Sequence, residues 1–323
     1  MYWGSVMRGI RTTVSFGLAL GLLTASSLAA TAQEDPTSRA PIPSAGCGSS
    51  QVEPGTHRGS TELDSDGYSW VTRVPSAHDG VTPLPLWIQL HGCCGGSGME
   101  QMMLLRRATD EHGFVLVAPE ASIGRAGWTW REGDTEVDAS LSNPDIAFLD
   151  GLLDRLAQEY CLDLARVYAS GYSAGGEGVS VLACVLEDRI AAVAPVAGSL
   201  DLGATCEQER PVPVLAIHGT ADGVVPFDGG LSERYASIPV VADASVPDRV
   251  AAMAMRNGCA PIPRSEVVSD EVERLSWDCP EAATVELLVI DGGRHVWPKT
   301  MNGDPFDAEH VIWEFFEQHA MPE

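Results

Sequence analysis

The ten residues 167–176, VYASGYSAGG, decide which fold this sequence predicts. A strand-like run, 167–170, leads into the pattern G-x-S-x-G around Ser173, and a helical run, 179–186, follows it. Glycines on both sides of Ser173 let the backbone turn tightly, so the hydroxyl group projects at the start of a helix, where amides and the helix dipole favour a developing anion. A strand, a tight turn and a helix in this order form the context of a nucleophilic serine.

Short apolar or β-branched runs alternate with helical patterns on both sides of this motif. The expected strands cover residues 68–74, 86–90, 114–118, 167–170, 192–196, 214–217 and 285–290. Strands that alternate with helices form parallel sheets. The sequence therefore predicts an α/β fold, with a mainly parallel central sheet and helices on both faces.

Two of the expected helices have recognisable starts. Asn143 followed by Pro144 opens the first, and its leucines share one face that is expected to pack on the sheet: Leu149, Leu152, Leu153 and Leu156. The last helix is expected to begin with Asp304 as N-cap and Pro305 in its first turn. Its apolar side is expected to join the core: Val311, Ile312, Phe315 and Phe316.

The N-terminal 32 residues are organised as a signal peptide. Arg8 and Arg11 precede an apolar stretch, 14–23, and small residues lead up to Ala32. The stretch is shorter than the ~20 residues of a membrane helix, so we expect a secreted protein without a membrane anchor. Residues 33–50 are rich in Pro, Ser, Ala and Gly and predict a flexible leader. Residues 51–323 are then long enough for a single domain.

Charge and cysteine content exclude several classes of partner. The formal net charge is −25, from 45 acidic and 20 basic residues, so nucleic acid is not an expected partner. An even number of cysteines in an exported chain favours disulfides. No two cysteines have CxxC spacing, and the adjacent Cys93 and Cys94 suit neither a tetrahedral metal site nor an easy mutual bridge. We expect neither a metal nor a cofactor.

A serine nucleophile needs a base, and His295 has the most suggestive position among the eight histidines. It ends the segment DGGRH, residues 291–295, directly after the expected strand 285–290. In this kind of fold the chain order is serine, acid and histidine, with the histidine on a loop after the last strand. His295 is the predicted base, and the remaining candidates are expected to be structural: His57, His78, His112, His310 and His319.

The acid is expected between the serine and the histidine. Asp222 lies in HGTADGVVP, residues 218–226, after the expected strand 214–217, where its carboxylate could orient the imidazole of His295. Asp228 and Asp291 remain rivals because either could reach His295, and Asp201 is less well placed.

Two backbone amides are needed to hold an oxyanion. Ala174, directly after the serine, is expected to supply one, and Cys93 in the loop HGCCGG, residues 91–96, the other. His91 precedes the nucleophile in the chain and is expected to support this loop rather than act as base.

Five segments taken together resemble the secreted polyhydroxybutyrate depolymerase-like and feruloyl esterase family of α/β-hydrolases. They read LHG at 90–92, RVYASGYSAGG at 166–176, AAVAPVAG at 191–198, HGTADGVVP at 218–226 and HVWP at 295–298. The resemblance extends from about Gly67 to His319. It implies an α/β-hydrolase fold with Ser173 as nucleophile, Asp222 as acid and His295 as base. It also implies a disulfide between Cys259 and Cys279, and Cys184 with Cys206 is a second suggested pair.

The resemblance also limits the substrates. Members of the family hydrolyse feruloyl and related esters of plant cell-wall polysaccharide or cleave hydroxyalkanoate polyesters, and we favour the feruloyl esters. Arg294 and the doubled Cys93-Cys94 depart from the family pattern and leave the fit of the substrate open. Candidate substrate contacts are Trp297, Trp128, Trp130, Tyr172 and His91, although Trp128 and Trp130 could equally be core residues. A peptidase and a non-catalytic carbohydrate-binding or surface protein on the same scaffold are the rival functions.

Overall fold

A computed structural model describes residues 39–63, 66–93, 97–122, 128, 131–132, 136–231 and 244–321. The chain divides into two units, Met1–Glu34 and Asp35–Glu323, and every described residue belongs to the second. The predicted signal peptide lies outside the described residues. Among the described helices, none combines the length and the apolar character needed to cross a membrane.

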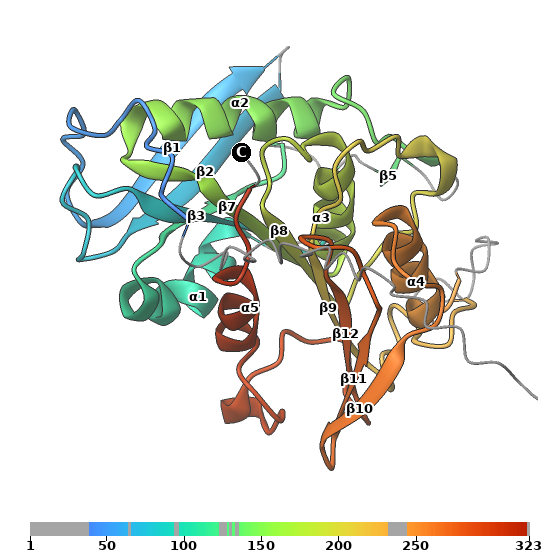
Figure 1. The fold of residues 1–323 in the computed structure, drawn as a ribbon. Coiled ribbons are helices and arrows are strands. Elements are labelled where there is room, and N and C mark those ends of the chain that lie inside the picture. The colour runs from blue at the N-terminus through green and yellow to red at the C-terminus, as the bar shows by residue number, and fades with distance from the viewer. Residues whose placement is uncertain are drawn as a thin grey trace, which may run out of the picture. The chain divides into compact units, whose positions relative to one another are not determined.

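The second unit is built around a ten-stranded sheet with the strand order β1-β2-β4-β3-β7-β8-β9-β12-β11-β10 (Figure 1). Its central strands are parallel: β4 (Val115–Pro119), β3 (Leu84–Leu90), β7 (Leu162–Tyr172), β8 (Ala192–Val196), β9 (Val214–Gly219) and β12 (Val285–Ile290). Antiparallel strands flank them: β1 (Gly55–Leu63), β2 (Asp66–Val74), β11 (Val272–Ser276) and β10 (Arg264–Ser269). A separate short pair is formed by β5 (Arg131–Glu132) and β6 (Glu136–Val137).

Five α-helices cover the two faces of this sheet in the described part of the chain: α1 (Gly98–His112), α2 (Pro144–Glu159), α3 (Ala174–Val185), α4 (Val246–Arg256) and α5 (Ala308–Phe316). Figure 1 shows α1 and α5 side by side on one face. Leu105 of α1 and Ile312 of α5 belong to one buried cluster with that face. Leu152 of α2, Val179 of α3 and Val250 of α4 belong to the cluster on the other face. The prediction of a mainly parallel sheet covered on both sides is confirmed.

The helix starts were predicted with unequal success. The side chain of Asn143 accepts hydrogen bonds from the amides of Asp145 and Ile146, and the leucine stripe of α2 is buried, so this prediction is confirmed. The prediction for the last helix was wrong by one turn, because α5 begins at Ala308. Asp304 accepts a hydrogen bond from the amide of Lys299 instead of capping a helix. Between Lys299 and the start of α5, the chain forms the short 3₁₀ turn η4 (Thr300–Asn302) and a loop.

Three strands at the two edges of the sheet, β1, β10 and β11, were not predicted. β1 reads GTHRGSTEL and alternates between half-buried and exposed residues, and every residue of β10 is exposed. Strands with so few apolar residues have no hydrophobic period that a sequence could reveal. Their hydrogen bonds to β2 and β11 hold them in the sheet.

The prediction of a flexible leader was wrong for residues 39–50. Ser44 donates a hydrogen bond to the Tyr160 carbonyl and accepts one from the Leu162 amide, while Pro43 forms a β-bridge with Asp163. A disulfide joins Cys47 to Cys161. The segment is therefore attached to the start of β7, and its Pro- and Ser-rich composition did not reveal this long-range anchoring.

Three disulfides connect described cysteines. The pairs Cys259–Cys279 and Cys184–Cys206 are both present, as the resemblance and the second suggestion had implied. The third, Cys47–Cys161, spans 114 positions. Cys93 is disulfide-bonded as well.

Candidate active site

The three side chains expected to carry the chemistry follow three strands of the parallel core. Ser173 comes directly after β7, Asp222 three residues after β9, and His295 five residues after β12. Because the carboxyl ends of parallel strands lie at the same edge of a sheet, loops after such strands converge there. The topology thus brings together residues that are 122 and 73 positions apart in the chain.

The three side chains form a continuous hydrogen-bonded series. The Ser173 Oγ lies 2.9 Å from Nε2 of His295, and Nδ1 of the same imidazole lies 2.7 Å from Oδ2 of Asp222. Ser173 and Asp222 are buried, and His295 is partly exposed. A carboxylate beside Nδ1 favours the tautomer with its proton on that nitrogen, so Nε2 is left to accept the serine proton.

Ser173 occupies a backbone conformation that L-residues rarely adopt. Its φ is 55° and its ψ is −121°, at the N-cap position of α3. A Cβ at Gly171 would lie 2.1 Å from the carbonyl oxygen of Gly175, and one at Gly175 would lie 2.4 Å from that of Leu90. Only glycine fits at these two positions. The G-x-S-x-G pattern is therefore a packing requirement of the turn that presents the hydroxyl group.

Asp222 is the carboxylate that contacts His295, and it is held by four donors. The amides of Val224 and Val225 each donate to Oδ1 at 2.8 Å, and Nε2 of His218 lies 3.2 Å from Oδ2. Burial by itself would raise the pKa of Asp222. The hydrogen bonds from His218, His295 and the Val225 amide outweigh burial and hold that pKa well below its ordinary value. The carboxyl group is therefore ionised over the whole neutral range.

His218 is a site residue that sequence reasoning did not single out. It lies four positions before Asp222, and its side chain is only 2% exposed. Besides Asp222, its Nε2 approaches the carbonyl oxygen of Val225 at 2.9 Å. Both neighbours of Nε2 are acceptors, so this nitrogen carries a proton. The sequence feature that could have indicated this role is the short segment HGTAD, residues 218–222, because its first residue, His218, contacts its last, Asp222.

Neither rival acid, Asp228 or Asp291, forms a hydrogen bond with His295 among the described residues. Asp228 is exposed. Asp291 is also exposed and accepts a hydrogen bond from the hydroxyl of Thr220 at 3.2 Å. The geometry therefore selects Asp222.

Tyr172 contacts the histidine loop from the other side. Its hydroxyl donates to the carbonyl oxygen of His295 at 2.9 Å, and the two rings are 5.1 Å apart. Burial raises the pKa of Tyr172 to about 12, with a further contribution from the charge of Asp222. The hydroxyl thus stays protonated and holds the loop that carries His295.

The loop after β3 passes directly beside Ser173. A Cβ built on Gly92 would lie 3.4 Å from the Cβ of Ser173. Cys93 is the next residue, and Ala174 opens α3 on the other side of the serine. The amide of Ser173 itself is bonded to the Val196 carbonyl at 2.9 Å. The two amides expected to hold an oxyanion therefore belong to the backbone segments that flank the Ser173 side chain.

Both ring nitrogens of His91 form hydrogen bonds with the protein backbone. Nδ1 donates to the Gly92 carbonyl at 2.6 Å, and Nε2 accepts from the Ala121 amide at 3.0 Å. Burial lowers its pKa, which favours this neutral form. Trp128 donates from Nε1 to the His91 carbonyl at 2.9 Å, with the two rings 4.8 Å apart. These contacts support the loop, as expected for His91, while Trp130 lies outside the described residues.

Trp297 is not at the surface of the site. It is 6% exposed, packs in the cluster beneath α1 and α5, and its Nε1 lies 3.3 Å from Oε2 of Glu309. This burial favours core packing over the expected substrate contact.

Two groups in the described residues could hold a metal ion, and both lie around the facing ends of α1 and α5: Glu111, His112 and His310, and Asp307, Glu309 and His310.

Comparison with known proteins finds esterases among the relatives of this chain. No family model matches it. Feruloyl esterase B of Piromyces equi is 28% identical over 257 residues, covering 78% of this chain and 45% of that protein. The chain thus spans less than half the length of this relative. Feruloyl esterase C of Emericella nidulans is 26% identical over 281 residues, covering 84% of this chain and 90% of that protein.

A solved structure agrees on the fold. The acetyl xylan esterase from Aspergillus awamori superposes with a TM-score of 0.56 at 13% identity, covering 80% of this chain and 99% of the other. The strained serine turn, the order of the three side chains and the two relatives agree with this likeness. The chain is thus similar to feruloyl esterases over most of its length, and its fold is that of the α/β-hydrolases.

Proposed function

We propose that this protein hydrolyses carboxylic esters through an acyl-enzyme intermediate on Ser173, with His295 as general base and Asp222 as the orienting acid. The observation that carries the proposal is the continuous path from Asp222 through His295 to Ser173, with contacts of 2.7 and 2.9 Å. A free serine hydroxyl is a poor nucleophile near neutral pH, and an adjacent imidazole held in one tautomer makes it reactive.

In the first half of the cycle, the Ser173 Oγ attacks the ester carbonyl while Nε2 of His295 takes its proton. Asp222 stabilises the imidazolium that forms. The carbonyl oxygen becomes an oxyanion, and the amides of Ala174 and Cys93 are proposed to donate to it. The start of α3 adds the positive end of a helix dipole at the same point. His295 then protonates the leaving alcohol.

In the second half, a water molecule attacks the acyl-enzyme and His295 accepts a proton from the water. Collapse of the second tetrahedral intermediate returns the proton to the Ser173 Oγ and releases the acid. The same nitrogen, Nε2, serves both halves because it alternates between acceptor and donor.

The proposed substrates are hydroxycinnamoyl esters, such as feruloyl esters, of plant cell-wall polysaccharide. Support comes from the relatives named above, both of which are feruloyl esterases and match 78% and 84% of this chain. They give no support to the hydroxyalkanoate polyester alternative. The acetyl xylan esterase likeness concerns the fold alone.

We also propose that residues 51–323 form one catalytic domain and that the enzyme is exported, with cleavage near Ala32. Disulfides persist in oxidising compartments, and three are present among the described cysteines. N-terminal sequencing of the enzyme recovered outside the cytoplasm tests this proposal. An intact N-terminus there would contradict the cleavage.

The decisive experiment measures hydrolysis of methyl ferulate, p-nitrophenyl acetate and a soluble hydroxybutyrate oligomer by the purified protein. Methyl ferulate is expected to be turned over with the highest kcat/KM. Ser173→Ala is expected to lower kcat by roughly 10⁴-fold or more, because the nucleophile is lost while the binding surface remains.

The matched control is Ser269→Ala, the same change on the exposed edge strand β10, which is expected to leave kcat unaltered. Preference for the hydroxybutyrate oligomer would move the assignment to polyester cleavage. Turnover that survives in Ser173→Ala would refute Ser173 as nucleophile.

A further inference from the structure

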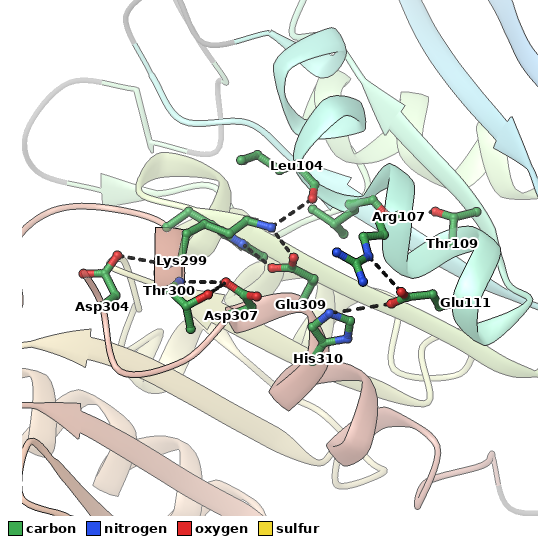
Figure 2. A network of polar contacts seen from close by, with 12 residues as sticks. Leu104, Arg107, Thr109, Glu111, Lys299, Thr300, Asp304, Asp307, Glu309 and His310 are labelled. Carbon is green, nitrogen blue, oxygen red and sulfur yellow. Dashed lines mark hydrogen bonds and ion pairs between the residues drawn. The ribbon is translucent and has the colours of Figure 1, made fainter. Parts of the chain in front are cut away.

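Two histidines meet where α1 ends and α5 begins. His112 is the last residue of α1, and His310 lies in the first turn of α5. The Nε2 of His112 is 3.2 Å from the Nδ1 of His310. Glu111, which precedes His112, directs Oε2 at the His310 ring, 3.7 Å from its Nε2, and Figure 2 shows this carboxylate and imidazole facing each other. One ligand atom from each of the three residues lies within 4.8 Å of the other two.

The separation of the two imidazole nitrogens suits a shared metal ion. Zn²⁺ binds histidine nitrogen at about 2.0–2.1 Å in tetrahedral sites, which puts two such nitrogens about 3.3 Å apart. The observed 3.2 Å is close to that value. The two nitrogens therefore lie at the separation that one shared ion requires.

The surroundings favour a cation at this point. His112 lies at the C-terminal end of α1, where the helix dipole is negative. Glu314 on α5 and Glu317, directly after α5, add negative potential at His112. Arg107 is the neighbouring positive charge, and its Nε donates to Oε1 of Glu111 at 2.8 Å. That contact leaves Oε2, which lies 3.7 Å from the other ring nitrogen of His310, to turn towards an ion held by Nδ1.

The overlapping group of Asp307, Glu309 and His310 suits a metal less well. The carboxylate of Glu309 is already contacted by Nζ of Lys299 and by Nε1 of Trp297. Asp307 accepts hydrogen bonds from the amide and hydroxyl of Thr300 at 2.7 and 3.0 Å. Figure 2 shows the contacts of Lys299 with Glu309 and of Thr300 with Asp307 alongside the Glu111–His310 pair. A metal there would have to break them.

We propose that His112, His310 and Glu111 form a binding site for one Zn²⁺-class transition-metal ion that ties the end of α1 to the start of α5. Two imidazoles and one carboxylate are a ligand set that Zn²⁺ and its neighbours accept, whereas Ca²⁺ and Mg²⁺ prefer oxygen ligands throughout. Water would complete the coordination. The ion would also steady Glu309, the residue adjacent to His310, which anchors the chain segment that follows His295.

Calorimetric titration of the untagged, EDTA-treated and desalted protein with ZnCl₂ tests the site. One equivalent is expected to bind with a micromolar dissociation constant, and saturating Zn²⁺ is expected to raise Tm by roughly 5 °C, because an ion that binds only the folded state stabilises it. CaCl₂ is expected to do neither. These readouts do not depend on the esterase reaction, so they are separate from the test of Ser173.

His112→Ala and His310→Ala are each expected to weaken Zn²⁺ binding by about tenfold or more and to abolish the rise in Tm. His57→Ala is the matched control, because His57 is a half-buried histidine on β1 outside the proposed ligand set, and this variant is expected to bind Zn²⁺ as the wild type does. Circular dichroism and ester hydrolysis verify that each variant is folded. Wild-type protein that binds no Zn²⁺, or folded His112→Ala and His310→Ala variants that bind it unchanged, would show that the two imidazoles form only a hydrogen-bonded pair.

Discussion

At the scale of single residues, the proposed site includes a histidine, His218, that contacts Asp222 and forms no described hydrogen bond with Ser173. Nε2 of His218 and Nδ1 of His295 approach the same oxygen of Asp222, at 3.2 and 2.7 Å. The carboxylate is thus fixed from two sides, and the two amide contacts to its other oxygen prevent rotation. His218 acts through Asp222 and is a positioning residue.

Replacing His218 with phenylalanine is expected to lower kcat/KM for methyl ferulate by roughly 10- to 100-fold, since a hydrogen bond to a charged acceptor is removed. His218→Gln keeps an N–H donor and is expected to recover part of the loss. Steady-state kinetics on both variants measure the effect. Equal activity in His218→Phe and wild type would mean that the amides of Val224 and Val225 hold Asp222 unaided.

A second residue-scale prediction concerns stability against pH. Burial lowers the pKa of His319 to about 4, from an ordinary value of 6.5. Between these values the unfolded chain binds the proton and the folded one does not, so stability rises with pH. Above about pH 6.5 the titration of His319 does not affect the free energy of unfolding. As the pH falls to about 4, it lowers that free energy by about 3 kcal/mol.

Urea unfolding over that pH range, compared between wild type and His319→Leu, isolates the effect from the other titrating groups. The difference in unfolding free energy between the two proteins should shift by about 3 kcal/mol in favour of the variant as the pH falls. A difference that does not depend on pH would contradict a buried neutral His319.

At the scale of elements, α5 and the turn before it anchor the chain that follows His295. Lys299, the single lysine of the sequence, contacts the Glu309 carboxylate and donates from Nζ to the Leu104 carbonyl of α1 at 3.1 Å (Figure 2). Both charged side chains are largely buried. Trp297 contacts the same carboxylate, so one glutamate of α5 holds two residues of the histidine loop.

Lys299→Met is expected to destabilise the metal-free protein by about 3–5 kcal/mol, because it leaves the buried charge of Glu309 without its partner. The double variant Lys299→Met/Glu309→Leu is expected to recover part of that loss. Arg107→Met breaks an exposed pair on α1 and, as control, is expected to leave the free energy of unfolding nearly unchanged. Urea unfolding measures all three, and a loss for Lys299→Met no larger than that for Arg107→Met would refute the anchoring role.

The elements also show how far local patterns reach. The seven expected strands were recovered because each is an apolar run buried in the sheet, and α2 was recovered because its cap and stripe are adjacent in the chain. α5 was predicted to start too early because Asp304 and Pro305 form a good helix start locally. The competing hydrogen bond from the Lys299 amide to Asp304 belongs to the turn before it and cannot be read from composition.

At the scale of the whole molecule, the Cys47–Cys161 disulfide fastens the described start of the chain to the central sheet. Cys161 directly precedes β7, the strand that carries Ser173, and the bridge closes a loop over 114 positions. In the chain-entropy model a longer closed loop restricts the unfolded chain more. This bridge should therefore contribute more than Cys259–Cys279, which spans 20 positions.

Cys47→Ser/Cys161→Ser is expected to lower the free energy of unfolding by up to about 5 kcal/mol, and Cys259→Ser/Cys279→Ser by about 3 kcal/mol. Urea unfolding of the two double variants under non-reducing conditions compares them directly. A smaller loss for the longer loop would show that the unfolded chain is already restricted near residue 47.

The sequence by itself determined the features that depend on neighbours in the chain. These are the glycine-flanked turn at Ser173, the buried strands and the order of serine, acid and histidine, because φ preference and hydrophobic period are local properties. Only the tertiary structure decided which aspartate meets His295, that His218 shares it, and that Trp297 is buried. It also brought His112 to His310 across 198 positions. Such contacts follow from the order in which strands pair and helices pack, and no short segment carries that information.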